Sequence, residues 1–450
     1  MPQKNRSVFR KVKIVSRQVS FENESVYPRR AFLQGGAASV TSAALLAKAE
    51  AVSSASSLIS VGIMGVNGRG KALARGFAQD PRARIVALCD VDTRVAGPLA
   101  EQLAKEYQHK PRVEVDVRRL LDDHSIDALV VATPNHWHAP ATILGCRAGK
   151  HVYVEKPCSH TAEEGELAEA AARQHNRVVT MGSQRRTWPA IREAIALVRS
   201  GVLGEVHLAR SWYANRRGPM GIKKPTPPPS WLHWGLWQGP APERPFRDNV
   251  VHYNWHWLWH WGDGELGNNG VHAVDLARWG LNVEFPIHTS AIGGRYHYED
   301  DQETPDTMSV AWAFPDNKMI TWEGLSCIPN GLGGNGFGVT FVGTDGSIVI
   351  DGGGYRHLDP KGKVVVSQTG DSGDAGHISN FLDCIVNAER PNADISEAHR
   401  STLLCHLGNI AWRTGAALKT DPENGHIVNH PEASRLWGRE YRDEWNIRRS

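Results

Sequence analysis

A glycine-rich turn is the first feature of this sequence that has the residues for chemistry. It covers residues 65–70, follows the apolar run 58–64 and precedes an amphipathic stretch, and a second apolar run, 83–89, ends at Asp90. This order predicts a strand, a turn, a helix and a strand ending in an acid, which is a dinucleotide-binding unit. Glycines let the backbone approach a pyrophosphate, and the helix N-terminus supplies N–H donors. We therefore expect a dinucleotide to contact Gly65, Asn67, Gly68, Arg69 and Gly70.

The identity of the dinucleotide is predicted from Asp90, which lies 25 residues after Gly65. A carboxylate there accepts hydrogen bonds from ribose hydroxyls and repels a 2′-phosphate. The predicted cofactor is therefore NAD rather than NADP, although Arg94 nearby weakens that preference. Asn67 stands where a glycine is usual, and asparagine tolerates left-handed backbone angles, so we expect the turn to form.

Further alternation of strands and helices extends this unit into a domain. Apolar runs at 127–133, 151–154 and 177–181 predict strands, with helices at 139–148 and 162–175 between them. Such spacing predicts a parallel, doubly wound sheet, in which ligands bind at the carboxyl ends of the strands. Two polar loops, 133–138 and 155–157, are expected at that edge.

Several motifs together make the chain similar to a known family from residue 58 nearly to the C-terminus. These motifs are the glycine turn and the stretches 132–138, 149–157 with its Glu-Lys-Pro sequence, 270–275, 391–395 and 404–410. With them, the sequence resembles the glucose–fructose oxidoreductase/inositol dehydrogenase/MocA (Gfo/Idh/MocA) family. The resemblance implies an α/β Rossmann domain followed by an α+β domain with a large, open, mostly antiparallel sheet. It also implies NAD-dependent oxidation of a sugar or polyol.

The resemblance assigns roles to particular positions. Lys156 would lie between the nicotinamide and the substrate hydroxyl, with Glu155 as its partner on the cofactor side. His272 would be the catalytic base, and Asn135 and His138 would lie near the nicotinamide ribose and the pyrophosphate. We expect the rest of the cofactor site to include Thr133 and Gln184, and the substrate to contact Asn268, Trp255, His256 and Arg185.

These roles agree with the chemistry that the residue types allow. Hydride departure from an alcohol carbon requires removal of the hydroxyl proton, and histidine is the commonest base near neutral pH. A cation such as Lys156 stabilises the developing alkoxide. The purely structural alternatives are a lysine at the end of a surface strand and, for His272, a histidine in the core of an amphipathic helix.

One position departs from the pattern of the family. An aspartate usually precedes the histidine by four residues, but here the residue is Asn268. The carboxylate that would raise the basicity of the imidazole is therefore missing. This leaves open whether His272 works alone and whether the reaction is a simple alcohol oxidation.

Seven of the 16 tryptophans fall between residues 231 and 261. On an extended strand, the tryptophans at 255, 257, 259 and 261 would share one face and could stack on a sugar ring. The alternative is a hydrophobic core or a subunit interface, where tryptophan is also enriched. His252, His256 and His260 have helical spacing that would suit zinc with Asp263 or Glu265, but the interleaved tryptophans favour an extended loop, and we expect no metal.

The second half of the chain contains the remaining segments. The pattern predicts a helix at 189–199, strands at 205–213, 307–314, 318–323, 338–342 and 346–350, and helices at 378–388 and 398–414. We predict a Rossmann domain at 58–182, a substrate and oligomerisation domain at 183–430, and a polar tail at 431–450. An open sheet face suggests a homodimer or homotetramer.

The first 51 residues have the pattern of an export signal. Arg29 and Arg30 precede Phe32 and Leu33, a weakly apolar stretch covers 35–47, and small residues suited to cleavage follow. This predicts a twin-arginine signal recognised by the twin-arginine export machinery, and hence a periplasmic protein. The alternative is an unstructured basic tail on a cytoplasmic enzyme.

Composition limits the remaining possibilities. Residues 1–51 hold nine basic and three acidic residues, and the rest of the chain has 42 basic and 45 acidic residues. A slightly acidic body argues against nucleic acid as the partner. No apolar run reaches the roughly 20 residues that cross a bilayer, so we expect no stable membrane insertion. The six scattered cysteines are expected to be free thiols.

Three functions remain for an exported NAD protein. The first is an oxidoreductase that moves a hydride between a sugar or polyol and tightly bound NAD. The second cleaves glycosides by oxidation, elimination and reduction, and recycles its NAD. The third is a non-catalytic saccharide-binding protein. Because free NAD is scarce outside the cytoplasm, both catalytic functions predict a cofactor that does not exchange.

Overall fold

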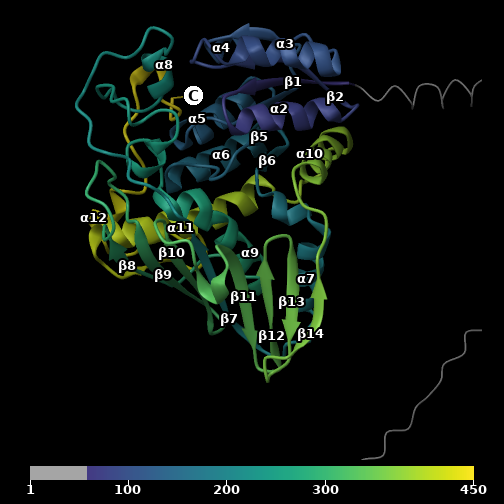
Figure 1. Ribbon diagram of the computed structural model, residues 1–450, viewed down its shortest axis with the longest axis vertical. Coiled ribbons are helices and arrows are strands. Elements are labelled where there is room, and N and C mark those ends of the chain that lie inside the picture. The colour runs from purple at the N-terminus through teal and green to yellow at the C-terminus, as the bar shows by residue number, and fades with distance from the viewer. Residues whose placement is uncertain (1–57, 450) are drawn as a thin grey trace, which may run out of the picture. The chain divides into compact units, whose positions relative to one another are not determined.

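Two β-sheets organise the part of the chain that the structure describes, residues 58–449 of a computed structural model (Figure 1). The predicted export signal at 1–51 lies outside these residues. Within the described part, no helix has the length and apolarity needed to cross a membrane.

The first sheet has the strand order β3-β2-β1-β4-β5-β6, and every pair is parallel. This confirms the predicted Rossmann fold. The sequence did not reveal β3, because it has three residues and no buried side chain. The strands are β1 (Ile59–Met64), β2 (Ala83–Cys89), β3 (Arg112–Glu114), β4 (Ala128–Val131), β5 (His151–Val154) and β6 (Val179–Met181).

Helices cover both faces of this sheet. The helices α2 (Arg69–Gln79) and α3 (Ala96–Tyr107) pack on one face, and α5 (Asn135–Arg147) and α6 (Ala162–Gln174) lie on the other. A short helix, α4 (Arg118–Leu121), precedes β4. These are the faces that alternating parallel strands and helices require.

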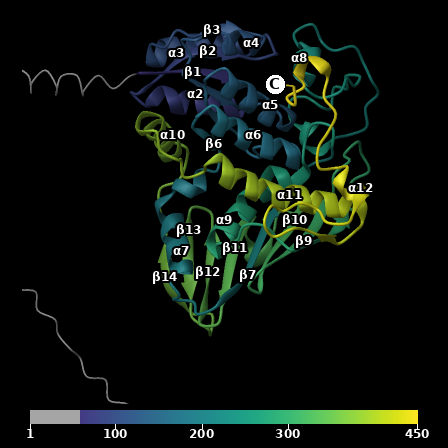
Figure 2. The same cartoon turned by 180° about the vertical axis from the view of Figure 1, so that it is seen from behind.

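A later helix, α10 (Ala375–Asn387), completes the layer that contains α2 (Figures 1 and 2). Its Phe381 is fully buried and meets Phe77 and Tyr153 edge to face, at ring-centroid distances of 6.2 and 5.9 Å. Although it follows the second sheet in sequence, α10 therefore belongs to the core of the Rossmann sheet. It also brings Asp374, at its N-terminus, to the cofactor edge.

The second sheet has nine strands in the order β14-β13-β12-β11-β7-β10-β9-β8-β15, antiparallel except for the β7–β10 pair. This confirms the predicted large, mostly antiparallel sheet. Its strands are β7 (Val206–Ala214), β8 (His288–Gly294), β9 (Thr307–Phe314), β10 (Lys318–Leu325), β11 (Phe337–Gly343), β12 (Gly346–Asp351), β13 (Gly354–Leu358), β14 (Val364–Gln368) and β15 (Leu418–Lys419).

Three helices cover one face of the second sheet: α7 (Pro189–Arg199), α9 (Val271–Leu281) and α11 (Ile395–Thr414). Side chains on the strands alternate between this core and the opposite face, where Arg210, Ile292 and Met319 are exposed. The last helix, α12 (Pro431–Ser434), is short. The first turn of α9 reaches the Rossmann domain, and this places His272 at the junction of the two domains.

The tryptophan-rich segment, residues 218–262, links β7 to the region before α9. Within residues 218–262, the structure lacks the strand on which alternating tryptophans would share one face, and it agrees with the alternative of a hydrophobic core. The segment forms the short helix α8 (Trp234–Gln238) and a 3₁₀ turn at Asn254–Trp257, and no strand runs through its described residues. Trp255, Trp257 and Trp261 are buried in one apolar cluster with Trp237. The indoles bury one another in a compact loop, so they form no flat platform.

Candidate active site

The glycine turn has the close backbone approaches that a dinucleotide site requires. Gly65 has φ of +81°, and a Cβ there would lie 2.8 Å from the carbonyl oxygen of Ala132. A Cβ on Gly70 would lie 1.7 Å from the carbonyl oxygen of Gly65. Only glycine fits at these two positions. Helix α2 then begins at Arg69, and no side chain within residues 58–449 caps its first N–H groups, which can therefore meet a pyrophosphate.

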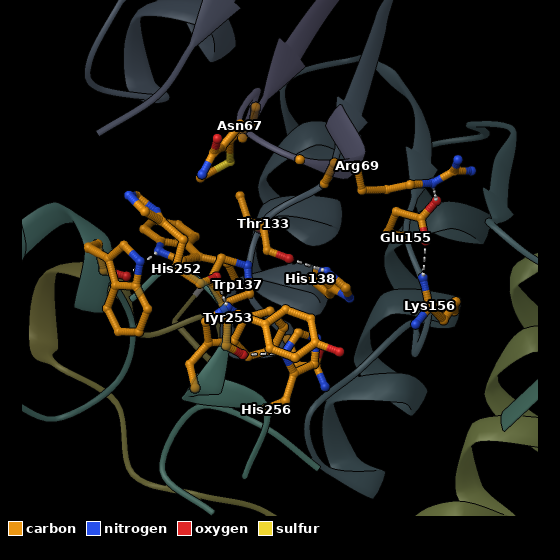
Figure 3. Close-up of a pocket in the computed structure, with 18 of the residues that line it drawn as sticks. Asn67, Arg69, Thr133, Trp137, His138, Glu155, Lys156, His252, Tyr253 and His256 are labelled. Atoms are coloured by element: carbon orange, nitrogen blue, oxygen red, sulfur yellow. Dashed lines mark hydrogen bonds and ion pairs between the residues drawn. The ribbon is translucent and has the colours of Figure 1, made fainter. Parts of the chain in front are cut away.

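One cavity of about 690 Å³ extends from this turn to the second domain. Its size suits a cofactor together with a small substrate. Figure 3 shows Asn67 and Thr133 between two groups of side chains, with Arg69, Glu155 and Lys156 on one side and His252, Tyr253 and His256 on the other. Of the residues predicted from sequence, the lining includes Gly65, Asn67, Gly68, Arg69, Asp90, Thr133, Asn135, His138, Glu155, Lys156, Gln184, Trp255, His256, Asn268 and His272.

Asp90 lies at the cavity edge, after β2. Its carboxylate accepts the backbone N–H of Val66 at 2.7 Å and that of Asp92 at 2.9 Å. Burial raises the pKa of Asp90, and these two N–H donors oppose the shift. The Arg94 side chain is bound by Asp92 at 2.7 Å and lies over the Trp231 ring. Arg94 is therefore engaged elsewhere, and Asp90 is the carboxylate that lines this edge of the cavity together with Asp116.

Lys156 follows β5 and crosses to the second domain. Its ammonium donates to the backbone carbonyl of Asn268 at 2.7 Å and to the side-chain oxygen of the same residue at 2.9 Å. Burial lowers the pKa of Lys156, while the nearby Glu155 and Glu265 oppose that shift. A partly desolvated cation with a neutral partner has a large electrostatic effect on any oxygen that approaches it.

Glu155 has a different partner from the one that the sequence predicted. Its carboxylate binds the Arg69 guanidinium at 2.6 Å, and Arg69 also binds Asp374 in a two-pronged contact at 2.6 and 2.7 Å. Lys156 reaches Glu155 only through its backbone N–H, at 3.3 Å. Arg69 is thus held between two carboxylates at the start of α2.

Asn268 and His272 lie on one continuous structure. Asn268 belongs to the π-helical turn Leu266–Gly270, which leads directly into α9. The side chain of Asn268 binds Lys156, and His272 makes no side-chain hydrogen bond within residues 58–449. Burial lowers the pKa of His272 well below its ordinary value, and the charges of Arg185, Lys156 and Arg69 add to the shift. The imidazole is therefore neutral near pH 7.

The loop after β4 joins the two sides of the site. The ring nitrogens of His138 lie 2.6 Å from the Pro157 carbonyl and 2.7 Å from the Thr133 carbonyl, so the ring links the loops that follow β4 and β5. Asn135 donates to Asp263 at 2.8 Å. These side chains position the edge of the cavity.

The predicted substrate residues have separate positions. Trp255 and His256 line the cavity and stack on each other at a ring-centroid distance of 3.6 Å. Burial lowers the pKa of His256 to about 3. Arg185 lies over the rings of Phe337 and Trp188, at 4.1 and 5.0 Å, and is not among the residues that line the cavity.

The three histidines with helical spacing have different partners. His252 lies 3.1 Å from Asp92 in the Rossmann domain, and His260 lies 2.7 Å from the Pro242 carbonyl. The ring of His256 is bound at the Tyr253 carbonyl. Among the described residues, no group of three or more His, Cys, Asp or Glu side chains is arranged to hold a metal ion.

Other cavity residues were missed from the sequence. Tyr213, Asn215 and Arg217 lie at and just beyond the end of β7, and Arg217 binds Glu265 at 2.8 Å. The only signal was a polar end to the predicted strand. Trp445, from the predicted polar tail, also lines the cavity and is 5% exposed. Nothing in its local sequence indicated that position.

Two models of known protein families match this chain. Residues 59–183 match the model of an oxidoreductase family with an NAD-binding Rossmann fold, and residues 196–447 match the model of its C-terminal α/β domain. The chain belongs to the Gfo/Idh/MocA oxidoreductase family. The Rossmann domain of this family member is therefore an NAD-binding domain, as its glycine turn and Asp90 indicated.

The names of individual relatives describe enzymes that act on sugars or polyols. Levoglucosan dehydrogenase from Pseudarthrobacter phenanthrenivorans is 27% identical over 225 residues, which is 49% of this chain and 50% of that protein. Inositol 2-dehydrogenase from Rubrobacter xylanophilus is 34% identical over 36% of this chain and 46% of its own length. An α-N-acetylgalactosaminidase from Shewanella oneidensis is 29% identical over 33% of each chain. The matches thus span half or less of these relatives.

Solved structures share the fold of this family member over most of its length. The aldose–aldose oxidoreductase from Caulobacter crescentus, complexed with glycerol, has a TM-score of 0.64 at 20% identity and covers 80% of this chain and 99% of its own. Levoglucosan dehydrogenase complexed with NADH and levoglucosan has a TM-score of 0.61 at 20% identity, with 80% and 99% covered. At this identity, the likeness concerns the fold.

Replacing Asp90 tests its place in the cofactor site. In Asp90→Asn, the charge that faces the ribose is lost, and the turn loses a carboxylate acceptor. Because a hydrogen bond to a charged group contributes about 1.5–3 kcal/mol, we expect NADH to bind roughly 10- to 100-fold more weakly. Fluorescence titration with NADH measures this, and the exposed Asp122→Asn is the matched control. Unchanged affinity in Asp90→Asn would contradict the assignment.

Proposed function

We propose that this protein is an NAD-dependent oxidoreductase that acts on a hydroxyl-bearing carbon of a sugar or polyol. The observation that carries the proposal is the Lys156–Asn268 contact beside a neutral His272, in the same cavity as the glycine turn. The names of the relatives, levoglucosan dehydrogenase and inositol 2-dehydrogenase, support the substrate class.

The residues of the chain divide the chemistry between them. NAD⁺, held at the glycine turn and Asp90, would supply the acceptor for the hydride of the alcohol carbon. His272 takes the hydroxyl proton, so that the alcohol becomes a carbonyl and the histidine an imidazolium. Lys156 holds a positive charge beside the oxygen while that proton departs. Asn268 fixes the direction of the ammonium, and the rings of Tyr253 and Trp255 form part of the wall that limits water.

A second candidate function is redox-neutral cleavage of a glycoside. Asn268 in place of a carboxylate favours it, and a relative is named as an α-N-acetylgalactosaminidase. Oxidation of a ring carbon to a ketone makes the neighbouring C–H acidic. Loss of that proton expels the glycosidic oxygen as an alcohol, water then adds to the double bond, and the stored hydride returns to the carbonyl. The net reaction is hydrolysis.

This second function has its own test. Incubation with glycosides in heavy water incorporates deuterium at the carbon that loses its proton, and free sugar accumulates without net NADH. A simple dehydrogenase instead yields NADH and a ketone or lactone in equal amounts, with no released alcohol. A saccharide-binding protein yields neither product.

We propose further that the chain is exported through the twin-arginine machinery to the periplasm, on the basis of Arg29, Arg30 and the weakly apolar stretch 35–47. Changing both arginines to lysine is expected to leave the protein in the cytoplasm of a bacterium that has this pathway, as cell fractionation would detect.

The exposed face of the nine-stranded sheet supports assembly into a homodimer or homotetramer. Light scattering tests the oligomeric state.

Two variants test the proposed oxidoreductase. We expect Lys156→Met to lower kcat by roughly 10²–10³-fold, because it removes the charge that stabilises the developing alkoxide. His272→Asn is expected to lower it by roughly 10²–10⁴-fold through loss of the base. NADH formation with a panel of sugars and polyols measures both effects, and affinity for NADH is expected to stay close to that of the wild type. The account fails if both variants turn over at the wild-type rate.

The pH profile tests the pairing of Lys156 with a neutral amide. His272 must be neutral, and its low pKa places the acid limb of kcat/KM below pH 6.5. Lys156 must be charged, and its lowered pKa places the alkaline limb below pH 10.5.

A carboxylate in Asn268→Asp would raise the pKa of Lys156 by about 1–3 units and move the alkaline limb upward. Asn282→Asp, at the exposed end of α9, is the control. An alkaline limb unmoved by Asn268→Asp would exclude Lys156 as its source.

A further inference from the structure

The tryptophan-rich segment is attached to the Rossmann domain beside Asp90. The backbone N–H of Thr93 donates to the Trp231 carbonyl at 3.0 Å, and that of His233 donates to the Val91 carbonyl at 3.0 Å. Residues 91–93 directly follow the acid that faces the ribose. The segment therefore adds a short antiparallel contact to the turn that carries the cofactor acid.

Four side chains in mutual contact fix this attachment: Asp92, Arg94, Trp231 and His252. Asp92 is fully buried, and its carboxylate binds Arg94 at 2.7 Å and lies 3.1 Å from His252. The guanidinium carbon of Arg94 lies 3.4 Å from the centre of the Trp231 ring, and that ring stacks on His252 at 5.8 Å. Asp92 and Arg94 of the Rossmann domain thus hold His252 and Trp231 of the segment. Asp92 contacts the His252 imidazole, and the Arg94 cation lies over the Trp231 ring.

The C-terminal arm, residues 435–449, reaches the same end of the cavity. Trp445 packs edge to face on Trp137 at 4.9 Å and lies under the Arg118 guanidinium, also at 4.9 Å. Arg442 donates to the carbonyl oxygens of Gly235 in α8 and Gly239 at its C-terminal end, each at 2.6 Å, and so joins the arm to the tryptophan-rich segment. Figures 1 and 2 both show the C-terminus next to α8 and α5.

These elements meet where the adenosine half of a dinucleotide belongs. In a sheet of this order, the loops after β2 and β3 flank that half, and the cavity lining includes residues from both loops, such as Asp90 and Asp116. His252 and Trp445 line the same cavity. The indole nitrogen of Trp445 is buried and has no hydrogen-bond partner within the described residues. Adenosine has an aromatic surface that suits the indole and imidazole rings lining this end of the cavity.

We propose that the tryptophan-rich segment and the C-terminal arm form a clamp over the adenosine half of NAD, in which Trp445 and His252 are cofactor-binding residues and which keeps the cofactor bound through successive turnovers. Dissociation of NAD then requires the Asp92–His252 contact or the packing of Trp445 to open. The clamp depends on the NAD-binding domain and is independent of which hydroxyl is oxidised.

The test measures release of cofactor from the full chain. The protein is loaded with NADH and chased with excess NAD⁺, and loss of NADH fluorescence gives the dissociation rate. NAD that survives dialysis is quantified after denaturation. We expect slow release from the wild type and release on the order of 10- to 100-fold faster in Trp445→Ala and in His252→Ala. The matched controls Trp412→Ala and His288→Ala lie outside the cavity and are expected to release NADH at the wild-type rate.

The outcomes separate the clamp from the rest of the account. Equal release rates in the wild type and both cavity variants overturn the clamp, whether or not sugars are oxidised. Absence of NADH binding by the wild type overturns both the clamp and the cofactor site. If Trp445→Ala does not fold, Trp445→Phe, which keeps a ring and removes the unpartnered N–H, and His252→Ala decide the question.

Discussion

The contact between Lys156 and Asn268 joins the two domains at the place where the proposed chemistry occurs. A buried ammonium is costly unless hydrogen bonds replace its water, and here two oxygens of a single residue replace part of it. Because Lys156 follows a strand of one sheet and Asn268 precedes a helix that packs on the other, the pair forms only when both domains have folded. The charge is therefore placed with precision but is not neutralised.

The neighbouring residue, Glu155, carries a carboxylate, but this carboxylate neutralises Arg69 and not Lys156. Glu155 is committed to Arg69, and Arg69 to Asp374 at the start of α10. This ion-pair chain fixes the N-terminus of α2, where the cofactor pyrophosphate is expected, and it leaves the Lys156 ammonium hydrogen-bonded to Asn268 and to no carboxylate of the described residues. The fold thus separates two positive charges in the same cavity, one held by carboxylates for structure and one held by an amide for chemistry. The clamp then encloses the far end of that cavity with side chains from two distant parts of the chain.

Local patterns predicted most of the fold and part of the site. Apolar runs ending in Gly65 and Asp90 specified the Rossmann unit, because strand, turn and helix signals all lie within about 30 residues. Alternation similarly revealed β9 and β10. The tryptophan-rich segment was misread, because alternation in the sequence does not distinguish a strand from a loop whose rings bury one another. The pairing of Arg69 with Glu155 and Asp374, and the position of Trp445, depend on contacts between residues far apart in sequence, which no local pattern encodes.

The central claim is that a resident cofactor and the Lys156–His272 pair act on one hydroxyl in one cavity. Its most direct test is a single-turnover measurement. The full protein, carrying one equivalent of NAD⁺ and freed of excess cofactor, is mixed with a panel of sugars, polyols and glycosides while the absorbance band of reduced nicotinamide is recorded. The account predicts, for at least one compound, a rise that stops at one equivalent per chain, or a transient rise followed by sugar release. Reduction that appears only when free NAD⁺ is supplied would contradict it.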